Sequence, residues 1–185
     1  MTMGLLRVAL VLGLVAGSGL LSACTTVSSL EPVGDQPRPA LPADWEGTWV
    51  RQDHALVIRV ADPQQGLLEV AWVEAKGGAL RLEAYRVALR GAGDWTFGNV
   101  TEADQPGRSF WAALRRASGQ IVLWLPDAER CAKLVREGVV PGTVEGGGDV
   151  VLGRLTPEQT LRLVSQDQGG CVDWSEPLLF ARLGG

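Results

Sequence analysis

The feature that most constrains the fold is a series of short alternating apolar runs between Trp45 and Pro126. In the run HALVIRVA, Leu56, Ile58 and Val60 alternate with the residues between them, and a period of two is typical of a half-buried β-strand. The groups DPQQG, KGG, GAGD and EADQPG separate these runs and favour turns. The spacing predicts a mainly β antiparallel meander of about seven or eight strands, closed as a small barrel or folded as a sandwich.

One run changes its pattern part-way along. In ALRLEAYRVALR the apolar positions begin with Leu80 and Leu82 and then switch to Tyr85, Val87 and Leu89. Because successive side chains of a strand point to opposite faces, such a switch predicts a bulge or a bend at a barrel corner.

After Pro126 the pattern becomes partly helical. Asp127 is a good N-cap for the segment that ends at Gly138, and Thr156 followed by Pro157 is a typical helix start. We therefore expect two short helices in the C-terminal third, followed by a last strand over residues 178–183.

The N-terminus has the pattern of an export signal. Arg7 precedes an apolar run of about 14 residues, short of the roughly 20 that a membrane-spanning helix needs. The run ends in Leu21-Ser22-Ala23-Cys24, which resembles the lipobox of bacterial lipoproteins. This resemblance implies cleavage before Cys24, a lipid on its sulfur and acylation of the new α-amine. Thr25 stands where aspartate favours inner-membrane retention, so the resemblance implies the outer membrane, with the chain facing the periplasm.

These observations divide the chain into three parts. Residues 1–23 are the predicted signal peptide, 24–42 the lipidated cysteine with a flexible Ser-, Thr- and Pro-rich tether, and 43–185 a β-rich globular domain. The acyl chains on Cys24 are the predicted membrane contact. The formal net charge is −4, and the chain contains no basic cluster, which argues against a nucleic acid partner.

Two cysteines remain besides Cys24. Cys131 and Cys171 form an even pair in an exported chain, which predicts a disulfide. The alternative is two buried free thiols, because cysteine packs well as a small apolar residue. The single histidine, His54, is distant in sequence and there is no C-x-x-C motif, so we expect no metal site and no cofactor.

Two short stretches resemble lipocalins. Gly47-Thr48-Trp49 is similar to the G-x-W signature of that family, and Arg182 in FARL corresponds to the arginine that packs across its tryptophan. The resemblance implies that the last strand lies beside the first and that Arg182 lies over the Trp49 ring. The alternative is ordinary packing of a buried tryptophan after a small residue.

The aromatic balance favours binding over catalysis. The chain has 7 tryptophans against 1 tyrosine and 3 phenylalanines, and tryptophan suits apolar ligands and interfaces. The candidate residues for ligand binding or barrel closure are Trp45, Trp49, Trp72 and Arg182.

Trp95 and Trp174 also follow aspartates near turns, and we expect them near a cavity mouth if they are not core residues. No G-x-S-x-G elbow accompanies the serines, so we expect no enzyme. The sequence predicts a protein that binds an apolar or amphipathic envelope molecule. The alternative is an interaction module that tethers a partner protein or a cell-wall component near the membrane.

Overall fold

A computed structural model describes residues 25–52, 54–101, 107–117 and 119–184. Cys24 and the predicted signal peptide lie outside the described residues. The strands are β1 (Val27–Ser29), β2 (Gln36–Pro37), β3 (Gly47–Arg51), β4 (His54–Asp62), β5 (Leu67–Lys76), β6 (Ala79–Ala92), β7 (Trp95–Val100), β8 (Ser109–Ala117), β9 (Gln120–Trp124), β10 (Gly142–Val144), β11 (Val150–Leu152) and β12 (Leu178–Arg182). The helices are α1 (Pro42–Trp45), α2 (Ala128–Arg136) and α3 (Pro157–Leu163).

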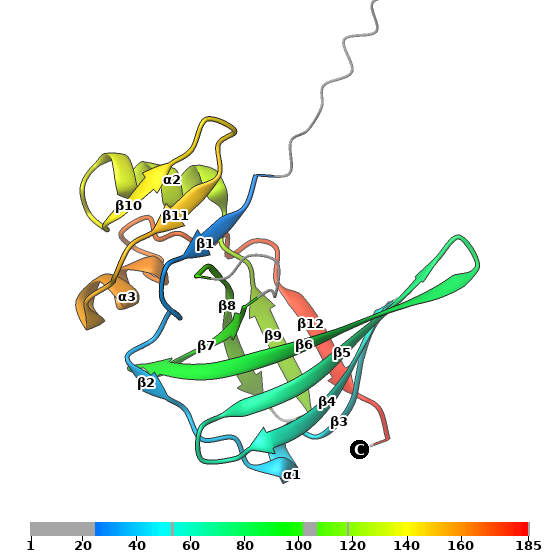
Figure 1. Ribbon diagram of the computed structural model, residues 1–185. Helices are drawn as coiled ribbons and strands as arrows, with labels where there is room; N and C mark the ends of the chain where they lie inside the picture. Colours follow the sequence, from blue (N-terminus) through cyan, green and yellow to red (C-terminus); the bar gives the residue numbers. More distant parts are fainter. Residues whose placement is uncertain (1–24, 53, 102–106, 118, 185) are drawn as a thin grey trace, which may run out of the picture.

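Eight antiparallel strands close into a barrel (Figure 1). From β3 to β9 each strand pairs with the next along the chain, and β12 then pairs with both β9 and β3. In the closing pair Arg182 lies opposite Trp49. The predicted mainly β barrel is confirmed, and the closure excludes the sandwich.

The turn between β4 and β5 shows how the sequence ends one strand and begins the next. Asp62 accepts hydrogen bonds from the backbone N–H groups of Gln64 and Gln65, at 3.0 and 3.1 Å. Gly66 follows with a φ of +64°, and a Cβ there would lie 2.2 Å from the Arg38 carbonyl oxygen. Only glycine therefore fits where the N-terminal segment crosses this turn.

The predicted bulge in the β6 segment is wrong. β5 and β6 pair without interruption from Leu67 opposite Ala88 to Lys76 opposite Ala79. The pair continues as a long hairpin that extends away from the barrel (Figure 1). Leu80 and Leu82 are 77% and 68% exposed on its outer face, so their apolar character does not mark the inside of the barrel.

The predicted flexible tether over residues 24–42 is wrong for its described part. β1 pairs in parallel with β11 and antiparallel with β8. Val33 and Ala40 are 2% and 0% exposed, and the backbone N–H of Val33 donates to Asn99 Oδ1 at 2.7 Å. A polar, Pro-rich composition did not prevent packing, because pairing with β8 and β11 satisfies the backbone of β1.

The two predicted helices of the C-terminal third are confirmed, and their caps match the sequence pattern. The Asp127 carboxylate accepts from the backbone N–H of Arg130 at 2.7 Å and caps α2. Thr156 and Gln159 form a reciprocal capping box at α3, with Pro157 at the first helical position.

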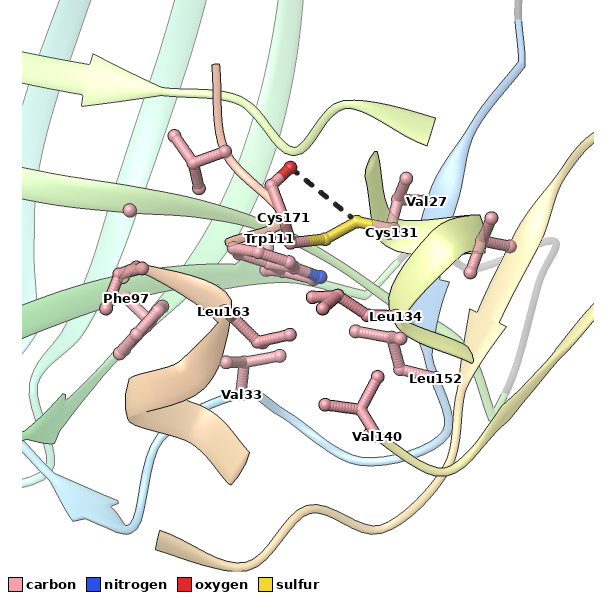
Figure 2. Close-up of a cluster of buried hydrophobic side chains, with 14 of the residues drawn as sticks. Val27, Val33, Phe97, Trp111, Cys131, Leu134, Val140, Leu152, Leu163 and Cys171 are labelled. Carbon is pink, nitrogen blue, oxygen red and sulfur yellow. Dashed lines mark hydrogen bonds between the residues drawn. A yellow bond between two sulfur atoms is a disulfide. The ribbon is translucent and has the colours of Figure 1, made fainter. Parts of the chain in front are cut away.

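The described residues form two apolar cores. One lines the inside of the barrel and includes Trp49, Leu89 and Phe180. The other lies between the outer side of β7 and β8 and the C-terminal third, and Figure 2 shows its centre. There the Cys131–Cys171 disulfide links α2 to the segment after α3, with the Cα atoms 4.5 Å apart. The predicted disulfide is confirmed, and the alternative of two free thiols is excluded.

Candidate functional site: the barrel cavity

The barrel encloses a cavity of about 430 Å³. Its walls are the inward faces of β4 to β9 and are almost entirely apolar, with Ile58, Val70 and Leu114 among the lining residues. Gly98 and Ala112 face each other in register on β7 and β8 and add little side-chain volume. The small size of these two residues therefore helps to keep the cavity open, because larger side chains at these inward positions would occupy it.

The helix α1 closes one end of the barrel. Trp45 is the last residue of α1 and lines the cavity. Trp45 does not share a strand face with Trp49, because Pro42 opens a short helix and the strand begins only at Gly47. The helical turn lets the Trp45 ring, 9% exposed, lie across the barrel end.

Trp49 and Arg182 hold α1 in place. The Trp49 indole N–H donates to the Trp45 carbonyl oxygen at 2.9 Å. Arg182 donates to the carbonyl oxygens of Ala43 at 2.9 Å and Glu46 at 2.5 Å, and its guanidinium carbon lies 5.4 Å from the Trp49 ring centre. These donors satisfy carbonyls that a four-residue helix leaves unpaired. The predicted stacking of Arg182 over Trp49 is confirmed.

Gly47 makes this arrangement possible. Its φ is +128°, and a Cβ at this position would lie 3.4 Å from Arg182 Nε. Glycine adopts this backbone conformation without steric cost. The small residue of the Gly47-Thr48-Trp49 stretch thus turns the chain from α1 into β3 beside Arg182.

The other end of the barrel is the open mouth. Leu125 and Glu83 are exposed members of the cavity lining, and Leu125 is 54% exposed. Tyr85, half-buried on β6, donates a hydrogen bond from its hydroxyl to Glu83 Oε2. The interior of the cavity is therefore apolar, and the hydrogen-bonded pair of Tyr85 and Glu83 lies at its mouth.

His54 and Trp72 lie on neighbouring strands beside this mouth. Trp72 lines the cavity, and the His54 ring meets it edge-on with centroids 5.1 Å apart. His54 Nε2 lies 3.8 Å from Glu74 Oε1. Trp45 and Trp72 thus border the cavity as candidate ligand residues, whereas Trp49 and Arg182 act at the closed end.

Trp95 and Trp174 are core residues and do not lie near the cavity mouth. Both pack with Trp124 in the core around the disulfide, with ring centroids 5.1 to 5.9 Å apart. Arg115 lies over Trp95, 4.0 Å from its centre. The aspartate before each of Trp95 and Trp174 therefore marks a turn on the outer side of the barrel.

Sequence reasoning missed Glu83 and Tyr85 as site residues. A carboxylate on an exposed part of a strand, such as that of Glu83, is most simply a solvated side chain. Its position on β6 has the same parity as Tyr85, Val87 and Leu89, which all line the cavity. The alternation of strand faces in the sequence could therefore have placed Glu83 on the inward face.

Among the described residues, two carboxyl groups have perturbed pKa values. Hydrogen bonds from the Thr26 backbone N–H and hydroxyl lower the pKa of Asp149. Those from Ser175 lower the pKa of Asp173. Neither residue lines the cavity. Within the described ranges, no group of three His, Cys, Asp or Glu side chains is arranged to hold a metal ion.

Comparison with known proteins finds no matching family model, no matching curated protein and no matching solved structure. Among the helices of the described residues, none has the length and apolar character to cross a membrane.

Proposed function

We propose that this chain is an outer-membrane lipoprotein whose periplasmic barrel binds an apolar or amphipathic envelope molecule without transforming it. The observation that carries this proposal is the apolar cavity of about 430 Å³ with one open end. Small-molecule sites typically measure about 300–1,000 Å³ and are mostly apolar with a few polar groups.

The anchor in this proposal is Cys24, with a signal peptide before it and acyl chains on its sulfur. Thr26 is tied to Asp149 by two hydrogen bonds, and β1 begins at Val27. An acyl anchor at Cys24 therefore joins the fold almost directly, so the domain stays at the membrane surface and within reach of lipid. In this scheme Cys24→Ser leaves the signal uncleaved, and a variant that still matures and fractionates with the outer membrane refutes the anchor.

One observation favours the alternative of an interaction module for a partner protein or a cell-wall component. The outer face of the β4–β6 sheet exposes Val57, Leu80 and Leu82, at 45%, 77% and 68%. Contiguous exposed apolar surface is typical of interaction sites.

A cavity-filling variant tests the binding proposal. Ala112 is half-buried and lines the cavity, whereas Ala181 is exposed on β12. Ala112→Phe places a ring in the cavity, and Ala181→Phe adds the same ring outside it. We expect the neutral fluorophore N-phenyl-1-naphthylamine to bind the wild type and Ala181→Phe alike, and to bind Ala112→Phe at least about tenfold more weakly, as expected where a site is occluded.

Equal binding of the fluorophore to Ala112→Phe and the wild type would refute the cavity as the site. Native mass spectrometry of protein taken from its own envelope then identifies what is bound. A co-purifying lipid or other small amphiphile supports the binding proposal, and a co-purifying protein with an empty cavity supports the interaction module.

A further inference from the structure

The two sides of the cavity mouth differ in chemistry. On β6 the mouth carries Glu83 and Tyr85, while Val100 on the neighbouring β7, Phe110 on β8 and Leu125 after β9 make the adjoining wall apolar. A ligand that enters with its apolar part first leaves its polar end at this mouth. Among the described residues that line the cavity, those whose side chains can hydrogen-bond to this polar end at the mouth are Glu83 and Tyr85 on β6.

Glu83 is the charged residue of this mouth. Among the described residues that line the cavity, no other has a carboxylate, amine or guanidinium side chain. Tyr85 donates to Oε2 of Glu83, and within the described part of the chain Oε1 has no hydrogen-bond partner. A carboxylate oxygen accepts hydrogen bonds and cannot donate them.

The neighbouring cations lie beside carboxylates, either in register or around the same hollow. Arg81 lies opposite Glu74 in register, one step farther from the cavity, and Glu74 also faces His54 at 3.8 Å. Arg51 borders a separate hollow together with Asp127 and Glu176. The charge nearest to the head of a bound amphiphile is therefore negative.

We propose that the cavity prefers amphiphiles whose polar end is an uncharged or cationic hydrogen-bond donor, and that Glu83 disfavours those with an anionic carboxylate end. This inference rests on the proposed binding function. A hydroxyl or ammonium group donates to Glu83 Oε1, whereas a carboxylate offers no donor and is repelled. Because Glu83 is exposed, solvent screening keeps the discrimination modest, at about fivefold.

The experiment compares three ligands with the same twelve-carbon tail. 1-Dodecanol, dodecylamine and dodecanoate each displace N-phenyl-1-naphthylamine from the purified protein, at neutral pH, with the alcohol below its solubility limit and the two ionic ligands below their micellar concentrations. We expect the alcohol and the amine to bind about fivefold more tightly than dodecanoate, as a single screened charge contact allows.

Glu83→Gln keeps the shape of the side chain and removes its charge. We expect this variant to bind dodecanoate within about twofold of 1-dodecanol and to weaken dodecylamine, because the charge contact is lost. Glu69→Gln is the matched control: Glu69 pairs with Arg59 at 3.3 Å on the outer face, so the order of the three ligands stays as in the wild type.

The outcomes separate the two proposals. If dodecanoate binds the wild type as tightly as the other two, or if the order survives Glu83→Gln, the head-group inference is wrong while cavity binding stands. If neither the fluorophore nor any of the three ligands binds the wild type, the proposed function fails as well.

Discussion

The contact between Trp49 and Arg182 links barrel closure to the end of the cavity, and its free energy can be measured. Trp49 is fully buried, and the Arg182 guanidinium lies 5.4 Å from its ring centre. Arg182 also joins β12 to the carbonyl oxygens of α1. Removing either side chain should therefore loosen both the strand closure and the helix that seals the barrel.

The expected losses differ in size. Trp49→Ala should lower the free energy of unfolding by about 3–5 kcal/mol, from lost apolar burial and the cavity left behind. Arg182→Ala should lower it by about 1.5–3 kcal/mol, because a half-exposed guanidinium loses its hydrogen bonds to carbonyls. The double variant should lose about 0.5–2 kcal/mol less than the sum, since the cation–π contact is counted in both single variants.

Urea unfolding followed by tryptophan fluorescence and circular dichroism measures all four proteins of this cycle. Arg59→Ala is the control, because the Arg59 side chain is 73% exposed on the outer face. The free energy of unfolding lost in Arg59→Ala should add to that lost in Trp49→Ala within about 0.5 kcal/mol. If Trp49→Ala is too unstable to measure, Trp49→Leu replaces it. Additive losses for Trp49 and Arg182 would refute the idea that their contact stabilises the closed end.

Two further predictions concern the two cores. Replacing both cysteines, as Cys131→Ala with Cys171→Ala, should lower the free energy of unfolding by about 4 kcal/mol for a bridge across 40 residues; urea unfolding checks this, and an unchanged midpoint would contradict it. In the barrel, Leu89→Ala should cost about 2–5 kcal/mol because Leu89 is 1% exposed. Leu82→Ala should change stability by no more than about 0.5 kcal/mol because Leu82 is 68% exposed, and equal losses at both positions would show that the hairpin face is buried.

Local chemistry was enough to predict several elements of this fold. Strand alternation around Leu56 and Ile58 indicated which residues face inward, and both are buried in the barrel. The caps at Asp127 and Thr156 predicted the starts of α2 and α3, because capping depends on residues three positions away. Such signals act over a few residues, so the sequence displays them directly.

Two long-range predictions also succeeded, for a different reason. With two cysteines left after Cys24, pairing Cys131 with Cys171 required no choice among connectivities. The contact of Trp49 with Arg182 followed from resemblance to a family pattern, not from the residues between them.

The predictions that failed depended on what covers a segment. Alternation says that Leu80 and Leu82 share a strand face, but only the tertiary structure shows that the hairpin leaves the barrel and exposes that face. Composition suggested a tether for residues 24–42, yet Val33 and Ala40 are buried. A few apolar side chains suffice where neighbouring elements provide a surface to pack against.

The sequence by itself determined the β class, the helix starts and the cysteine pairing of this protein, because these depend on local pattern or on simple counting. Only the tertiary structure decided that the barrel is closed and hollow, that Trp45 seals it from a helix, and that Glu83 stands at its mouth. The physical reason is that a cavity is defined by side chains from strands distant in sequence. Their combined volume leaves space only once closure has set the distance between the walls.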